Sequence, residues 1–220
     1  MRTIATLVIA LFSLSVFAAE PAKPAAASAA TYIEGKDYIL LDAPVRPHDP
    51  SKIEVAEVFN YLCGHCFQFE PLVSAWAKTQ KTDVSLVPVH ASWSEAMAPY
   101  QRGYYTAVLL KVKDKSHQAI FDKIHREGKE LATAEAWAEA LSAHGVTKQA
   151  VISSYNSFVV SSMVAQADQR VLGYKITSTP ELIVDGKYRI SSRLVGSQKA
   201  MLKVAQFLVD KTRAERATKK

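Results

Sequence analysis

The two cysteines of this chain of 220 residues stand three positions apart, in the run Cys63-Gly64-His65-Cys66. The residues before them are apolar and those after them have helical spacing, so the pair is expected at the first turn of a helix. There the helix amides favour a thiolate, with the first sulfur exposed and the second shielded. This placement predicts redox chemistry by a Cys63–Cys66 disulfide. His65 could donate a hydrogen bond or positive charge to a Cys63 thiolate, or it could simply be solvated.

Other uses of the cysteine pair are less favoured. A structural disulfide would close a loop of about four residues, which removes only about 2 kcal/mol of unfolded-state entropy. A zinc site would need further ligands, but there is no second cysteine pair, and His48, His90 and His117 are scattered. Haem attachment requires a histidine directly after the second cysteine, where Phe67 stands. The sequence therefore predicts neither a metal nor a cofactor.

The first residues have the pattern of an export signal. Arg2 precedes an apolar run from Ile4 to Phe17, and small residues follow around Ala18. The run is too short for a membrane-spanning helix, and its flanks are typical of a secretory signal peptide. We expect residues 1–18 to be removed, and residues 19–31, rich in Ala, Pro and Ser, to form a flexible tether. The mature chain would then reach a compartment where disulfides persist.

Composition agrees with a folded domain. Hydrophobic residues make up 49% and charged residues 22% of the chain, which is typical of globular proteins. The net charge of +6 is spread along the chain and gives no nucleic-acid signature. Two cysteines are too few for a disulfide scaffold or a four-cysteine iron–sulfur or zinc site.

The apolar patterning alternates between strands and helices. A buried strand is predicted over 52–62, a helix kinked at Pro71 over 67–78, and a second strand over 84–89. Strands return at 180–184 and 187–190 around an Asp185-Gly186 turn, before a final helix over 197–213. Between them, helical spacing covers 96–112, 116–131, 134–143 and 148–172.

Helix boundaries in this middle segment carry their own signals. Gly145 is placed to stop one helix, and Thr147 to cap the next, which carries Phe158 on its apolar face. Gly173 is expected to end the last helix in the same way as Gly145.

From about Tyr32 to the end of the last helix, the chain resembles the DsbA family of periplasmic thiol:disulfide oxidoreductases. The resemblance is carried by YIEGKDY (32–38), EVFNYLCGHCFQFE (57–70), and Thr179-Pro180 leading into VDGKY (184–188). It implies an α/β protein, a thioredoxin fold with an inserted all-helical domain. The expected division is a thioredoxin-like domain over 32–93 and 173–213, the helical insertion over 94–172, and a basic tail over 214–220.

The resemblance also implies roles for individual residues. Cys63 corresponds to the attacking cysteine and Cys66 to the partner buried behind it. Pro180 corresponds to a cis proline beside the disulfide, with the Thr179 backbone free to pair with a substrate strand. Glu57 corresponds to a buried acid beneath the site, although a charge at a strand edge facing solvent is the alternative.

Two features depart from the family pattern. Gly64-His65 stands where the best-known members have Pro-His, and Val87-Pro88 fall where some members place a lysine near the buried acid. Proton handling by a Glu–Lys pair and the redox potential are therefore open.

Together these features predict a periplasmic dithiol oxidase, a monomer that donates its Cys63–Cys66 disulfide to unfolded exported proteins with free thiols. The resemblance implies reoxidation by a DsbB-type membrane quinone reductase, with no nucleic-acid partner. One alternative is an isomerase or reductase of the same fold, which usually carries a dimerisation domain for which the tether leaves no room. The other is a non-enzymatic exported holdase, which would keep its activity without either cysteine.

Overall fold

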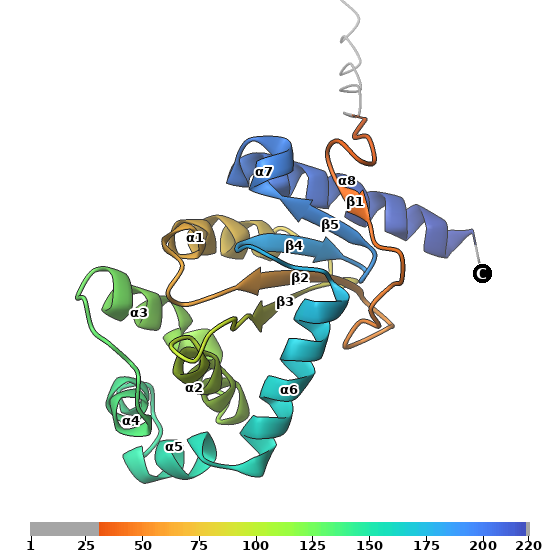
Figure 1. Ribbon diagram of the computed structural model, residues 1–220. Helices are drawn as coiled ribbons and strands as arrows, with labels where there is room; N and C mark the ends of the chain where they lie inside the picture. The colour runs from red at the N-terminus through yellow and green to blue at the C-terminus, as the bar shows by residue number, and fades with distance from the viewer. Residues whose placement is uncertain (1–30, 219–220) are drawn as a thin grey trace, which may run out of the picture. The chain divides into compact units, whose positions relative to one another are not determined.

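The computed structural model describes residues 31–218, and its centre is a five-stranded mixed sheet with the order β1-β5-β4-β2-β3 (Figure 1). Strands β2 and β3 are parallel, whereas the pairs β2–β4, β4–β5 and β1–β5 are antiparallel. The expected signal peptide over 1–18 and nearly all of the tether over 19–31 lie outside the described residues. The strands are β1 (Ile39–Leu40), β2 (Ile53–Phe59), β3 (Val84–His90), β4 (Glu181–Val184) and β5 (Tyr188–Ser191).

Helices cover both faces of the sheet, and further helices lie beyond one of these faces (Figure 1). One core joins α1 and α8 to alternate residues of β2, such as Val55. The other joins Ala56 and Val58 to α2 and α6, and it continues without a break to Trp137 of α4. The helices are α1 (Gly64–Lys78), α2 (Ala98–Leu109), α3 (Lys113–His125), α4 (Ala134–Ser142), α5 (Lys148–Tyr155), α6 (Phe158–Gly173), α7 (Ser192–Val195) and α8 (Gln198–Ala217).

The helical segment expected over 148–172 is two helices, so the prediction of one continuous helix was wrong. The break comes at Asn156, and the hydroxyl of Ser157 caps α6 by accepting from the Val160 N–H at 3.2 Å. Phe158, expected on the apolar face, is 86% exposed because it begins the second helix. The Thr147 cap on α5 is present, with its hydroxyl accepting from the Ala150 N–H at 3.1 Å.

Two glycines expected to stop helices behave differently. Gly145 follows α4 with φ +93°, the left-handed conformation expected of a stop. Gly173 does not adopt it, and Lys175 takes the positive φ (54°) instead. A Cβ at Gly173 would lie 2.7 Å from Val45 Cγ2. The reason for glycine at 173 is therefore a close approach of the 44–50 segment.

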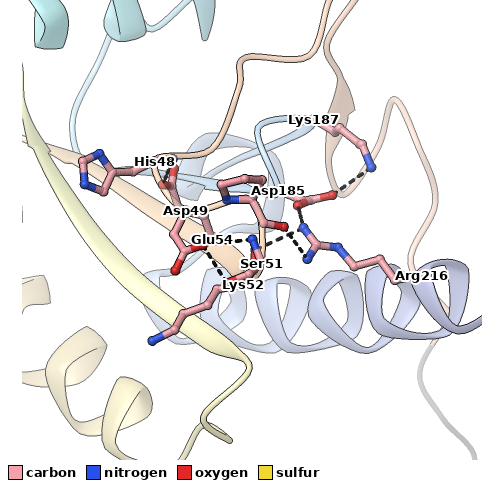
Figure 2. Close-up of polar contacts among 9 residues, drawn as sticks. His48, Asp49, Ser51, Lys52, Glu54, Asp185, Lys187 and Arg216 are labelled. Atoms are coloured by element: carbon pink, nitrogen blue, oxygen red, sulfur yellow. Dashed lines mark hydrogen bonds and ion pairs between the residues drawn. The ribbon is translucent and has the colours of Figure 1, made fainter.

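The C-terminal end of α8 is anchored beside the turn between β4 and β5, where Arg216 and Lys187 both approach Asp185 (Figure 2). Arg216 pairs with Asp185 of the β4–β5 turn and donates to the carbonyls of Pro50 (3.3 Å) and Lys52 (3.1 Å). Lys187 shares Asp185 at 2.8 Å. Helix α8 thus continues through Ala217, into the segment that the sequence assigned to a basic tail.

None of the helices within residues 31–218 is both long enough and apolar enough to cross a membrane.

Candidate active site

The two cysteines lie where β2 passes into α1, at the end of the sheet opposite the Arg216 anchor. Asn60 shapes this turn: its carbonyl accepts from the Cys63 N–H at 3.0 Å, and its Oδ1 accepts from the Leu62 N–H at 2.7 Å. Its own amide donates to the Ala91 carbonyl, just beyond β3, at 2.7 Å. Cys63 is therefore held as the extended N-cap of α1, with Cys66 in the first turn.

The two sulfur atoms have opposite environments. Both residues are free thiols, Cys63 half-buried and Cys66 fully buried. The Cys66 N–H donates to Cys63 Sγ at 3.3 Å. Hydrogen bonding to Cys66, followed by bonds involving Thr179 and the backbone of Cys66 and His65, lowers the pKa of Cys63 to about 5 against its burial. Burial raises the pKa of Cys66 well above its ordinary value. At neutral pH Cys63 is a thiolate and Cys66 keeps its proton.

The loop before β4 completes the site. The peptide bond between Thr179 and Pro180 is cis. Cys63 Sγ lies 3.4 Å from the Thr179 carbonyl oxygen, so part of the Thr179 backbone, which was expected to be free to pair with a substrate strand, is in contact with the cysteine itself.

His65 contributes through its backbone. Its side chain is exposed, and within residues 31–218 the imidazole makes no hydrogen bond to Cys63, whereas the backbone lowers the pKa of that thiol. The Gln198 amide donates to the His65 carbonyl at 2.7 Å and so ties the start of α1 to the start of α8. Gly64 stands in open space, since a Cβ there would meet nothing within 4 Å.

Glu57 is buried in β2 and is only 2% exposed, so it does not face solvent at a strand edge. Its register partner in β3 is Pro88, and among the described residues its Oε2 has no hydrogen-bond partner. Burial first, and then the charge of Glu70, raise the pKa of Glu57, while Lys113 of α3 opposes them. Burial therefore favours the protonated form of Glu57.

A second buried acid, Glu70 of α1, lies close to Glu57 and was not anticipated. It accepts from Ser74 Oγ at 2.6 Å and lies 3.3 Å from His117 Nε2. Against its burial, hydrogen bonding and the charge of His117 lower the pKa of Glu70. His117 and His125 lie at helical spacing on one face of α3, but this local spacing gives no signal for a contact with Glu70.

The remaining histidines do not gather into a metal site. The part of the chain that the structure describes contains no group of three or more His, Cys, Asp or Glu side chains placed to hold a metal ion.

Comparison with known proteins identifies this arrangement. A family model described as a DSBA-like thioredoxin domain matches residues 74–206. The chain belongs to this family. The thiol:disulfide interchange protein DsbA of Pseudomonas aeruginosa is 36% identical over 189 residues, 86% of this chain and 90% of that protein. DsbA of Azotobacter vinelandii is 39% identical over 180 residues, 82% of this chain and 84% of that protein.

Structural comparison gives the same answer for this DSBA-like chain. The crystal structure of Pseudomonas aeruginosa DsbA matches with a TM-score of 0.80 at 36% identity, covering 86% of this chain and 97% of that one. The prediction of a thioredoxin fold with a helical insertion is confirmed. The DSBA-like protein is a thiol:disulfide oxidoreductase that exchanges disulfides with substrate proteins.

Proposed function

We propose that this protein is a dithiol oxidase that donates a Cys63–Cys66 disulfide to its substrates. The observation that carries the proposal is the asymmetry of the two thiols, with the pKa of Cys63 lowered to about 5 and that of Cys66 raised. A sulfur that is stable as a thiolate is a good leaving group, and it stabilises the reduced form over the disulfide. Such an enzyme releases its disulfide readily.

The reaction then runs in two exchanges. A substrate thiolate attacks Cys63 Sγ, the bond to Cys66 breaks, and Cys66 leaves and takes up a proton. The second substrate thiolate attacks the substrate sulfur of the mixed disulfide, and Cys63 leaves as a thiolate. Two substrate thiols are oxidised and the enzyme keeps two electrons as a dithiol. Cys63 is the exposed partner in this scheme because Cys66 is fully buried.

The other site residues take supporting roles in this proposal. Pro180 and Thr179 form the wall of the site beside Cys63, and their loop guides the substrate segment. Gly64 leaves the sulfur approachable, and His65 supports the Cys63 thiolate. Glu57, whose burial favours the protonated form, is the group beneath the site that exchanges protons when Cys66 changes state.

The sequence and the family support a proposal for the cellular setting of this protein. Residues 1–18 would export the protein to the periplasm, where it meets unfolded proteins with free thiols. A DsbB-type membrane quinone reductase would accept the two electrons and restore the disulfide. We propose a monomer.

A redox titration against glutathione tests the direction of transfer. The oxidase proposal expects a reduction potential above about −180 mV, well above the value of about −270 mV of thioredoxin. A potential at or below the thioredoxin value would make the protein a reductase and overturn the proposal. In a parallel assay, the Cys63→Ser, Cys66→Ser variant should lose all oxidation of reduced substrate protein.

A further inference from the structure

Tyr61, two residues before Cys63, has each of its polar groups bonded to a different histidine. Its N–H donates to His90 Nε2 at 3.1 Å, its hydroxyl lies 2.7 Å from His117 Nδ1, and its carbonyl lies 2.8 Å from His125 Nε2. Burial lowers the pKa of His90 to about 3, which keeps that ring neutral and able to accept. Residue 61 is therefore fixed from β3 on one side and from α3 on the other.

His125 differs from the other two because it touches both sides of the cysteine pair. Besides its contact with the Tyr61 carbonyl, its ring stacks on Phe67, with centroids 4.9 Å apart and planes at 10°. Phe67 directly follows Cys66. A carbonyl oxygen can only accept a hydrogen bond, so the geometry requires the proton of His125 to be on Nε2.

The hydrogen bond from His125 completes the fixation of one peptide group. The peptide between Tyr61 and Leu62 has its carbonyl held by His125 and its N–H held by Asn60 Oδ1 at 2.7 Å. This peptide leads directly into Cys63. The direction in which the chain enters α1 decides how the Cys66 N–H points at Cys63 Sγ, which it meets at 3.3 Å.

We propose that His125 is a positioning residue of the redox site, through which the inserted helices hold the Tyr61 carbonyl and thereby stabilise the Cys63 thiolate. The inference rests on the proposed function, because it concerns the thiolate that drives that exchange. It gives the helical insertion a part in the chemistry: α3 supplies the donor, and the thioredoxin-like part supplies both cysteines.

Two variants separate the hydrogen bond from the stacking. His125→Gln keeps an N–H donor near the position of Nε2 but loses the ring, whereas His125→Phe keeps the ring on Phe67 but loses the donor. The readouts are the Cys63 titration, followed by thiolate absorbance at 240 nm, and the equilibrium with glutathione. One lost hydrogen bond corresponds to a factor of roughly three to ten in an equilibrium constant.

We expect His125→Phe to raise the pKa of Cys63 and to shift the glutathione equilibrium by that factor towards the protein disulfide. His125→Gln should stay within about twofold of the wild type. His144→Phe, in the turn between α4 and α5, is the matched control and should change neither readout. An unshifted His125→Phe variant, or equal shifts in the Gln and Phe variants, would overturn the proposal.

A measurement on the unaltered protein covers the case in which His125→Phe does not fold. Nitrogen-15 NMR of the reduced wild type should show His125 as the Nε2–H tautomer, and the Nδ1–H tautomer would overturn the assignment. The wild-type potential by itself tests the oxidase proposal, whereas the ratio of variant to wild type tests the role of His125, so the two can fail separately.

Discussion

At the scale of single residues, the chemistry depends on a difference between two identical side chains three positions apart. Cys63 is the N-cap and Cys66 lies inside the first turn, so hydrogen bonds converge on one sulfur and burial isolates the other. Local helix geometry thus separates the acidities of the two thiols, and within residues 31–218 no charged side chain is bonded to either sulfur. The two buried acids of β2, Glu54 and Glu57, are likewise identical side chains in different surroundings.

Alkylation should distinguish the two thiols. In the reduced protein at pH 6, iodoacetamide should modify Cys63 and leave Cys66 untouched, because the pKa of Cys63 is lowered to about 5 and that of Cys66 is raised. The rate should fall with a midpoint of about pH 5 as the pH is lowered. Peptide mass mapping provides the measurement. Equal modification of both cysteines at pH 6 would contradict the assignment of Cys63 as the reactive thiol.

His65→Ser separates the imidazole from the backbone of this residue. The backbone N–H survives the substitution, so any change reports the ring alone. Because the backbone contribution is retained and the imidazole makes no hydrogen bond to Cys63 within residues 31–218, we expect the pKa of Cys63 and the glutathione equilibrium to stay close to those of the wild type; a tenfold change in that equilibrium would correspond to about 30 mV. A potential that falls by clearly more than roughly 10 mV would show instead that the imidazole also stabilises the thiolate.

Glu57→Gln should stabilise the protein at neutral pH. The pKa of Glu57 is raised by burial, so the folded state binds its proton more tightly than the unfolded state. Stability from this group is therefore full at low pH and is lost as the pH rises above the unfolded value of about 4.3. Urea unfolding should show the variant ahead of the wild type at pH 7 and level with it near pH 4.

Glu54→Gln on the same strand is the matched comparison. Glu54 is equally buried but pairs with Arg170 and accepts from the His48 N–H at 2.7 Å. Its removal leaves a charge without its partner and should destabilise the fold by about 3–5 kcal/mol at pH 7. Opposite effects of the two Glu→Gln substitutions on the free energy of unfolding would show that the partners of each carboxyl group decide the sign. Destabilisation by both would show that Glu57 also has a stabilising partner.

At the scale of elements, local signals predicted most boundaries and long-range contacts decided the rest. Asp185 and Gly186 have the positive φ values of the hairpin turn that their sequence predicts, 53° and 65°. The break between α5 and α6, just before Ser157, contains no glycine or proline, so the helical spacing of the sequence predicted one continuous helix across it. Strand β1 and helix α7 escaped notice because they have only two and four residues.

The site shows the same division between local and distant signals. The cysteine pair could be predicted because its chemistry lies within one helical turn. The contacts of Glu70 with His117 and of Tyr61 with His125 join residues more than 40 positions apart, and no local pattern reports such contacts.

Gly173→Ala tests whether an element boundary is set from a distance. In an isolated helix the change would stabilise by about 1 kcal/mol. Here the new Cβ would meet Val45 Cγ2 at 2.7 Å, so we expect a loss of about 1–3 kcal/mol in thermal or urea unfolding. Adding Val45→Ala should recover part of the loss. Gly64→Ala, where a Cβ meets nothing, is the control; a stabilised Gly173→Ala variant would refute the close approach.

At the scale of the whole molecule, the helical insertion and the sheet share one core. The buried cluster that contains Ala56 and Val58 extends to Trp137. Trp137 in turn packs on Gly103 of α2 so closely that a Cβ at Gly103 would lie 1.9 Å from its ring. Because Cys66 belongs to the same cluster, we expect changes at the redox site to alter the stability of the fold as a whole.

The reduced protein should melt at a higher temperature than the oxidised protein at pH 7. A fold that favours the Cys63 thiolate over the disulfide must be destabilised by forming that disulfide, by thermodynamic linkage. The folded pKa of Cys63 is depressed, so this stabilisation is full above the unfolded thiol value. It is lost as the pH falls through about 5. Calorimetry of both forms at pH 7 and pH 5 measures it. A higher melting temperature for the oxidised form would identify the disulfide as structural.

Pro88, the residue of β3 opposite Glu57, affects which other chains can pair with the edge of the sheet. Strand β3 is the last in the sheet, and the Pro88 carbonyl accepts from the Tyr104 hydroxyl at 3.1 Å. Proline has no backbone N–H, so the edge strand β3 lacks a hydrogen-bond donor at residue 88. An extended polypeptide therefore cannot continue the hydrogen-bond ladder of the sheet at this position as an added strand. If its substrates are unfolded polypeptides, as proposed, we expect this edge to resist the addition of a substrate segment as an extra strand.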